Sequence, residues 1–314
     1  MEKKKLISVV IPCFNEVENV NIIYSAVVQE LEKISKVDFE ILFIDNHSND
    51  GTQNALRQLA QKSPKVKVIL NNRNYGPIRS PFYGLLQTRS DAAILMAADF
   101  QEPPGLISEF IGHWLNGHKV VAGVKSTSQE SYLKFKLRSL YYNILTRLSE
   151  DPLLTQFTGF ALYDADVIST FRMCNDPYPY LRGLVSELGY IPHTVFYHQP
   201  ERKFGKAKGT LKNMLNFGLL GLVSHSKVPL RIAIYIGMLS SLFSLLIAII
   251  YFLYKILYWN SFQLGIAPLV IGMSFFSSVQ LFFLGVVGEY VGITLAQVKK
   301  RPLVIEKERI NFNL

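Results

Sequence analysis

Two long uncharged stretches near the C-terminus constrain this chain more than any other feature. The first runs from Ile232 to Tyr254 and has 23 residues, and the second runs from Ile256 to Gly288 and has 33. A helix needs about 20 apolar residues to cross the ~30 Å hydrocarbon layer of a bilayer. Two buried core helices of a soluble protein are the alternative, but two adjacent stretches of this length favour a pair of transmembrane helices.

The composition agrees with a membrane protein and excludes several other classes. Hydrophobic residues make up 49% of the chain and charged residues 18%, whereas about a quarter of a soluble domain is charged. Disordered, collagen-like and coiled-coil proteins are therefore excluded. Cys13 and Cys174 are too few for a disulfide framework, and no Cys-x-x-Cys pair is present for zinc. The histidines show no ligand spacing, and we expect surface or core positions for His47, His113, His118, His193, His198 and His225.

The basic residues indicate which side of the membrane the rest of the chain occupies. The 33 basic and 24 acidic side chains give a net charge of +9. Basic residues precede the first stretch and follow the second, so both flanks are expected in the cytoplasm. Lipid headgroups explain charge beside a membrane better than nucleic acid does, and we expect no nucleic-acid partner. Surface contacts with anionic lipid are expected for Lys203, Lys206 and Lys212.

These features divide the chain into four parts. They are a cytosolic domain (1–209), an interfacial amphipathic helix (210–228), a two-helix transmembrane region (229–298) and a cytosolic tail (299–314). Leu211–Val223 is apolar on most sides directly before the first span, as an interfacial helix would be. A second amphipathic helix, at 133–148, is expected to pack on the domain's sheet. In the tail, Leu303–Ile305 predicts a strand for subunit contacts, and hence a homo-oligomer.

Apolar strands alternate with helical segments in the first part of the cytosolic domain. The expected strands are Leu6–Pro12, Phe39–Asp45, Val66–Leu70, Ala92–Ala97 and Val120–Gly123. The expected helices are Glu16–Ile34, Gly51–Lys62 and Ile78–Thr88, with a further one starting near Pro103. This alternation predicts an α/β fold with a doubly wound, mainly parallel sheet.

Acids and amides gather where three of these strands end. They lie in Pro12–Glu16, Asp45–Gly51 and Asp99–Glu102. Each segment alone is ordinary turn chemistry, and Asp99 is also suited to cap the helix near Pro103. Together they predict a ligand pocket, because ligands of open parallel sheets bind at the carboxyl ends of the strands.

The same segments resemble family 2 glycosyltransferases of the GT-A (Rossmann-like) fold. The matching stretches are Val9-Val-Ile-Pro-Cys-Phe-Asn-Glu16, Glu40-Ile-Leu-Phe-Ile-Asp-Asn-His-Ser-Asn-Asp-Gly-Thr52 and Ala98-Asp-Phe-Gln-Glu-Pro-Pro104. With Arg182–Val185, Arg202–Lys208 and the paired C-terminal stretches, the chain is similar to polyisoprenyl-phosphate glycosyltransferases such as dolichol-phosphate mannose synthases and bactoprenol glucosyltransferases. The resemblance extends from Ile7 to about Pro302.

The resemblance implies a role for each matching residue. The residues that would hold the nucleotide sugar are Pro12, Phe14, Glu16, Asp45, Asn46, Ala98 and Gln101. Asp99, the second acid of the family's DxD motif, would bind Mg²⁺ or Mn²⁺ together with Gln101, since hard divalent cations prefer oxygen ligands. Arg202 and Lys208 would meet the phosphate of the acceptor, with Arg182 and Lys125 as weaker candidates. The expected catalytic residues are Asp99, Arg202 and Lys208.

Three departures from the family pattern bear on this chemistry. Ala97 stands where the first DxD acid would be, and Asn46 stands where an Asp-Asp pair has its second acid. Gly159 and Ala161 replace the Asp, a proposed base, and the Arg of a Gly-Asp-Phe-Arg-Leu stretch. A lipid phosphate is largely ionised at neutral pH, so positioning matters more to it than deprotonation.

The resemblance thus implies inverting transfer of a sugar, from a UDP-linked donor to undecaprenyl phosphate. The reaction would take place at the cytosolic face of a bacterial plasma membrane and serve cell-envelope glycan modification. Two alternatives stay open: a non-catalytic membrane scaffold, and a glycosyltransferase with another lipid-linked glycan as acceptor. Retention of the acids Asp45 and Asp99, and of Arg202, argues against the scaffold.

Overall fold

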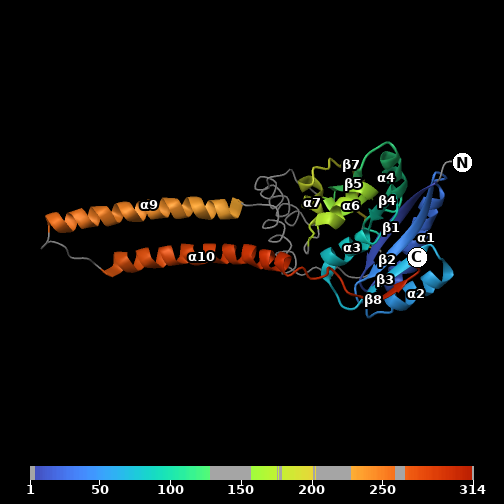
Figure 1. Cartoon of the computed structure of the whole chain (residues 1–314), viewed down its shortest axis with the longest axis horizontal. Coiled ribbons are helices and arrows are strands. Elements are labelled where there is room, and N and C mark those ends of the chain that lie inside the picture. The colour runs from blue at the N-terminus through green and yellow to red at the C-terminus, as the bar shows by residue number, and fades with distance from the viewer. Residues whose placement is uncertain are drawn as a thin grey trace.

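The computed structural model describes residues 4–127, 157–174, 176, 179–200, 202, 228–258 and 266–312 (Figure 1). Several predicted features lie outside this part of the chain: the helix at 133–148, the interfacial helix over 210–227, and Lys203, Lys206, Lys208 and Lys212. The description that follows concerns the described residues.

The predicted alternation of strands and helices is confirmed up to β5. The strands are β1 (Lys5–Cys13), β2 (Val37–Asp45), β3 (Val66–Asn71), β4 (Ala92–Leu95) and β5 (Val120–Thr127). The helices between them are α1 (Val17–Glu32), α2 (Thr52–Lys62), α3 (Gly76–Leu86) and α4 (Leu106–Leu115). The elements that follow, which the sequence did not predict, are β6 (Phe157–Asp164), α6 (Ala165–Cys174), α7 (Leu181–Glu187) and β7 (His193–His198).

All the strands form one sheet in the order β7-β5-β6-β4-β1-β2-β3-β8. The pairs β1–β2, β1–β4, β2–β3 and β5–β7 are parallel. The pairs β4–β6, β5–β6 and β3–β8 are antiparallel. The sheet is therefore mixed, with four parallel and three antiparallel pairs, and the expectation of a mainly parallel sheet is confirmed for its centre around β1.

The central strands are apolar throughout because helices cover both faces of the sheet. Successive side chains of a strand point to opposite faces. Val9 of β1 accordingly belongs to a core that includes Val20 of α1 and Phe110 of α4. Val10, the next residue, belongs to a second core with Phe82 of α3 and Phe171 of α6. This two-sided burial fixes the register of β1.

The tail of the chain returns to the domain and completes the edge of the sheet. Strand β8 (Glu306–Ile310) runs antiparallel to β3. Arg57 of α2 forms a 2.7 Å ion pair with Glu308. The expectation of a strand at Leu303–Ile305 is therefore wrong in its position, and the subunit contacts expected for it stay a prediction. The strand lies a few residues later, and its partner is β3 of the same chain.

Two long helices, α9 (Val228–Leu257) and α10 (Ile266–Val298), run side by side away from the sheet (Figure 1). Large apolar side chains such as Phe243 and Phe282 are exposed along them. Within the described residues, the segment Phe275–Val298 is long and apolar enough to cross a membrane by length and composition. Both predicted C-terminal helices thus exist as helices, and their place in a membrane is taken up under the proposed function.

Asn311, the residue after β8, provides a test of the tail's attachment. Its Nδ2 donates hydrogen bonds to the carbonyl oxygens of Ala60 at 2.7 Å and Val66 at 2.8 Å, and its φ of +61° lies in the left-handed region. Asn311→Ala is expected to lower the free energy of unfolding by about 1–3 kcal/mol, because two acceptors lose their donor and alanine is strained at this φ. Urea unfolding of the detergent-solubilised chain measures the change. The exposed Lys307→Ala on β8 is the control, and equal stability of the two variants would contradict this role.

Candidate active site

The parallel centre of the sheet brings three strand ends to one edge. Cys13, at the end of β1, lies opposite Asp45, at the end of β2. On the other side of β1, Val10 lies opposite Leu95, at the end of β4. The three polar segments predicted from the sequence follow these ends as loops, so the structure brings them together.

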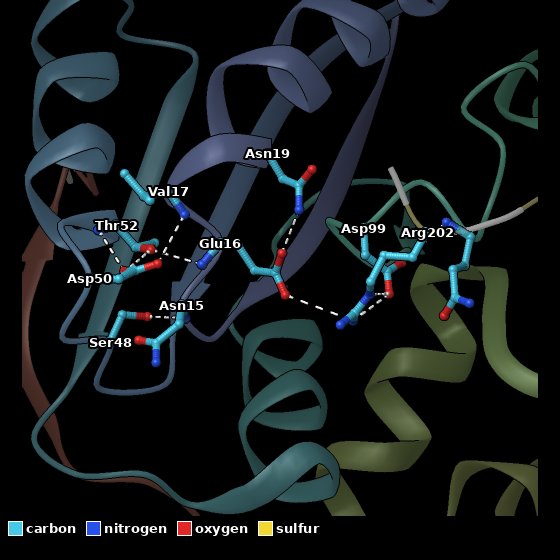
Figure 2. A network of polar contacts seen from close by, with 10 residues as sticks. Asn15, Glu16, Val17, Asn19, Ser48, Asp50, Thr52, Asp99 and Arg202 are labelled. Atoms are coloured by element: carbon cyan, nitrogen blue, oxygen red, sulfur yellow. Dashed lines mark hydrogen bonds and ion pairs between the residues drawn. The ribbon is translucent and has the colours of Figure 1, made fainter. Parts of the chain in front are cut away.

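Hydrogen bonds tie the loop after β1 to the loop after β2 (Figure 2). The backbone amide of Asn15 donates to Ser48 Oγ at 2.8 Å, and the backbone amide of Glu16 donates to Thr52 Oγ1 at 2.9 Å. In the other direction, the backbone amide of Asn49 donates to the side-chain oxygen Oδ1 of Asn15 at 2.9 Å. These bonds hold the Glu16 backbone at the edge of the sheet.

Each of the three loops contains a non-glycine residue with a left-handed backbone. The residues are Asn15 (φ 55°), His47 (φ 66°) and Phe100 (φ 63°). Such conformations cost energy and are held in place by the surrounding structure, and they concentrate at ligand sites. Their presence in all three loops supports a binding role for this edge.

Asp45 has a carboxylate oxygen that nothing in the described chain satisfies. The residue is fully buried. Its Oδ2 accepts hydrogen bonds from the Ser48 amide at 3.0 Å and from Gln53 Nε2 at 2.8 Å, whereas Oδ1 has no partner among the described residues. An unsatisfied buried acceptor costs about 1–3 kcal/mol. Oδ1 is therefore suited to accept a hydrogen bond from a ligand.

Asn46, in contrast, uses its whole amide within the protein. Its Oδ1 accepts hydrogen bonds from the Tyr75 amide at 2.8 Å and from Asn71 Nδ2 at 3.3 Å. Its Nδ2 donates to Asn74 Oδ1 at 2.9 Å and to the Gly76 carbonyl at 3.1 Å. A carboxylate has no hydrogen to donate to these two acceptors. The local structure thus explains why an amide stands where the family pattern has an acid.

Arg202 connects the acid after β4 to the acid after β1 (Figure 2). Its Nε and Nη2 both donate to Asp99 Oδ2, at 3.0 and 2.7 Å, and Nη2 lies 3.9 Å from Glu16 Oε1. The carboxylates of Asp99 and Glu16 are largely buried, at 8% and 12% exposed, whereas the Arg202 side chain is 24% exposed. Two acids from different strands therefore converge on one cation at the edge of the site.

The strand ends carry a negative electrostatic field. The pKa of the buried Cys13 thiol is raised well above its usual value, first by burial and then by the carboxylates of Asp45, Glu16 and Asp50. These acids disfavour a further negative charge at Cys13. The same field favours a cation among them.

Glu102 is a site residue that the sequence analysis did not single out. Its Oε2 accepts a hydrogen bond from the Ala97 amide at 2.6 Å, and its Oε1 accepts one from Thr158 Oγ1 at 2.9 Å. Burial above all, and then the charge of Asp99, raise its pKa to about 7, although both hydrogen bonds and Lys125 oppose the rise. Glu102 therefore joins the loop of Asp99 to the start of β6. The available signal was its position in the polar segment Asp99–Glu102, three residues after Asp99.

The other predicted site residues differ in what their positions allow. Pro12 and Phe14 are half-buried at the end of β1. Ala98 is buried in the core, so only its backbone can face a ligand. The backbone amide of Gln101 donates a hydrogen bond to Asp99 Oδ1 at 3.2 Å. Arg182 belongs to α7, but its side chain, like the whole of Lys208, lies outside the described residues.

The comparison with known families decides what kind of domain this is. Residues 8–171, from β1 to α6, match the model of "Glycosyl transferase family 2". The chain belongs to glycosyl transferase family 2. This match confirms the resemblance that the strand-end motifs indicated. The α/β sheet of this glycosyltransferase has the GT-A, Rossmann-like fold that the resemblance implied.

Relatives of this glycosyltransferase match it over nearly its whole length. CsbB of Bacillus subtilis (strain 168) is 32% identical, over 98% of this chain and 92% of its own. The prophage bactoprenol glucosyl transferase homolog of Escherichia coli (strain K12) is 31% identical, over 96% of this chain and 98% of its own. Among solved structures, mannosyl-3-phosphoglycerate synthase from Rubrobacter xylanophilus is 17% identical, with a TM-score of 0.48 over 70% of this chain and 72% of its own.

The raised pKa of Glu102 predicts a pH-dependent stability. Between its ordinary pKa near 4.5 and its folded value of about 7, the folded enzyme holds a proton that the unfolded chain has lost. The free energy of unfolding should therefore fall as the pH rises through this window, by up to about 3 kcal/mol from this group. Glu102→Gln removes the titration; its side-chain oxygen can accept from the Ala97 backbone amide, and its Nε2 can donate to Thr158 Oγ1. The free energy of unfolding of this variant, relative to that of wild type, should therefore rise from pH 5 to pH 8.

Urea unfolding at several pH values measures this difference. Glu32→Gln, which neutralises an exposed acid at the end of α1, is the matched control and should give a constant difference across the same range. A constant difference for Glu102→Gln as well would show that Glu102 keeps an ordinary pKa.

Proposed function

We propose that this glycosyltransferase moves a sugar from a nucleoside diphosphate donor, UDP-linked, to a polyprenyl phosphate such as undecaprenyl phosphate. The reaction takes place at the cytosolic face of a bacterial plasma membrane, and the product serves cell-envelope glycan modification. The observation that carries the proposal is the union, in one chain, of an acidic strand-end site with two long apolar helices. The full-length similarity to the E. coli bactoprenol glucosyl transferase homolog supports the choice of acceptor.

The closure of the sheet by β8 supports two membrane spans. β8 follows α10 in the chain, yet it pairs with β3 of the first domain. The chain between β7 and β8 must therefore cross a membrane an even number of times. Phe275–Val298 in α10 is one candidate span, and α9, a 30-residue helix, is the element available for the return. The basic flanks support a cytoplasmic location for both ends of this helical hairpin.

The acidic loops suit the donor's diphosphate and its metal. Asp99 and Glu16 already converge on a cation, the guanidinium of Arg202, so their oxygen donors fit a hard divalent ion such as Mg²⁺ or Mn²⁺. Asp99 would hold the ion, with Gln101, two residues later, as the second predicted ligand. When bound, the ion supplies Lewis-acid stabilisation of the leaving diphosphate. Asp45 Oδ1, which has no partner among the described residues, would accept a hydrogen bond from the nucleoside.

Arg202 then has two tasks at the boundary of the site. Before substrates bind, it neutralises Asp99 and Glu16. With a divalent ion held at Asp99, the Arg202 guanidinium would be available to an anionic phosphate, for which arginine is the preferred partner. We assign this phosphate to the acceptor lipid, and the sequence predicts Lys208 as a second contact of the same phosphate.

The transfer itself needs no side chain to remove a proton. An oxygen of the ionised lipid phosphate attacks the anomeric carbon from the face opposite the diphosphate. The new carbon–oxygen bond forms as the bond to the diphosphate breaks, and the electron pair leaves with the nucleoside diphosphate, which inverts the configuration. The φ of Gly159, +102°, favours glycine where the family has a proposed base, and an anionic nucleophile is consistent with this loss.

A lipid-transfer assay tests the proposed reaction. Membranes that contain the full chain are incubated with polyprenyl phosphate and one of several radiolabelled nucleotide sugars, and the lipid is extracted. One donor should give a labelled glycolipid, and EDTA should abolish its formation. Asp99→Asn should reduce the rate roughly a hundredfold or more, because several kcal/mol of charge stabilisation is lost. No labelled lipid with any donor would sink the proposal in favour of a scaffold or a different acceptor.

Arg202 variants separate the acceptor phosphate from the donor diphosphate. Arg202→Ala should raise the KM for polyprenyl phosphate or lower kcat, and Arg202→Lys should restore only part of the loss, because lysine cannot make the forked contact. Calorimetry should find donor affinity in the presence of Mg²⁺ little changed. Lost donor affinity with normal acceptor kinetics would move Arg202 to the diphosphate site.

A reporter fusion tests the membrane arrangement. A reporter that is active only in the cytosol should be active when fused after Leu314 and inactive when inserted at Asn260, between the two helices. Activity at both positions would show that α9 and α10 do not cross the membrane.

A further inference from the structure

Three histidines that are scattered in the sequence meet at one place in the structure. His113 lies in the last turn of α4, His118 follows that helix, and His193 is the first residue of β7. One potential ligand atom from each lies within 4.8 Å of the others. The ring centroids of His113 and His118 lie 4.0 and 4.4 Å from that of His193. All three residues are partly exposed, so a solvent ion can reach them.

The end of α4 brings the first two imidazoles together. Gly117 has a φ of +100° and reverses the direction of the chain after the helix. The Gly117 amide donates a hydrogen bond to the Trp114 carbonyl at 2.9 Å, and the His118 amide donates one to the His113 carbonyl at 3.3 Å. This pair of bonds is a Schellman motif, in which the two residues that correspond to His113 and His118 usually make an apolar contact. In this chain the motif presents two metal-ligating side chains instead.

Strand pairing delivers the third imidazole. β5 begins two residues after His118, and β7 lies parallel to it, with Val121 opposite His193. The cluster is therefore fixed by a helix end, a turn and a strand, and each of them is held by backbone hydrogen bonds.

The cluster is separate from the candidate active site. β5 is antiparallel to β6, which is antiparallel to β4, so β5 and β7 run in the same direction as β1. His193 starts β7 and therefore lies at the amino edge of the sheet, whereas the acidic loops follow the carboxyl ends of the strands. The contact of Lys5, at the start of β1, with the ring of Trp114 agrees with this placement.

We propose that His113, His118 and His193 form a binding site for a transition-metal ion of the Zn²⁺ class. Three neutral imidazoles with an open fourth position are an established donor set for Zn²⁺, whereas Mg²⁺ and Mn²⁺ prefer oxygen. Glu109, one turn before His113, has Oε1 at 3.9 Å from His113 Nε2, and it is in place to serve as a fourth ligand or to orient that ring. The ion would join α4 to β7 at the end of the domain remote from the sugar chemistry.

The two neighbouring imidazoles favour the neutral form of His193. Burial lowers the pKa of His193, and the neighbouring His113 and His118 lower it further, although Glu109 opposes them. A neutral imidazole keeps a lone pair for a metal.

The test uses the full chain, purified in detergent with a tag that contains no histidine and stripped with EDTA. Added Zn²⁺ should raise the melting temperature by several degrees once the free Zn²⁺ concentration is about a hundred times the dissociation constant. Co²⁺ should give the visible absorption of a tetrahedral centre. His118→Asn and His193→Gln keep polar side chains, and each should weaken Co²⁺ binding at least tenfold while the metal-free melting temperature stays close to wild type.

Two further variants make the result specific. His198→Ala, at the other end of β7, should bind Co²⁺ as wild type does. Asp99→Asn should keep the full Zn²⁺ shift, and loss of the shift in this variant would assign the ion to the active-site acids and overturn the proposal. Equal binding by wild type and by a variant that lacks all three histidines, or no shift in wild type, would overturn it as well.

Discussion

The parallel pairing of β1 with both β2 and β4 is the constraint on which the site depends. Because β1 lies between them in fixed register, three strand ends reach one edge. Burial on both faces maintains this register, since a slip by one residue would exchange the two cores. Each strand can then continue into a loop that is polar, locally strained and still anchored by hydrogen bonds to its neighbour. A rigid apolar centre thus supports the chemistry at its rim.

The acids at that rim are partly neutralised within the protein. Asp45, Asp99 and Glu16 come from three loops, and Arg202, which arrives from much later in the chain, lies against two of them. A site of unpaired buried acids would be unstable in the absence of ligand. The arginine stabilises the acids before substrates bind, and it exchanges partners more readily than a fully buried ion pair because it is partly exposed. The two acids that Arg202 neutralises, Asp99 and Glu16, are therefore also the groups suited to bind a cation.

The sequence predicted those parts that depend on local pattern. Each central strand was visible as an apolar stretch, and the acids were visible because strand ends of a parallel sheet meet. The insertion of β6 between β4 and β5 was not visible, since nothing in the order of the strands specifies it. Glu102 was missed because its role depends on Thr158, which is distant in sequence. The cluster at His193 was missed for the same reason. His193 meets the other two histidines only because β7 pairs with β5, and this pairing cannot be predicted from the spacing of the histidines in the sequence.

The position of β8 has a consequence for the order of synthesis. The ribosome makes β3 early, and it makes β8 only after both long helices. Residues 68 and 310 pair across this edge, so at about 5–20 residues per second β3 waits roughly 10–50 s for its partner. An open strand edge invites pairing with other chains during such an interval. The last contact of the domain therefore forms at the strand edge that was exposed longest, and only after both long helices have been made.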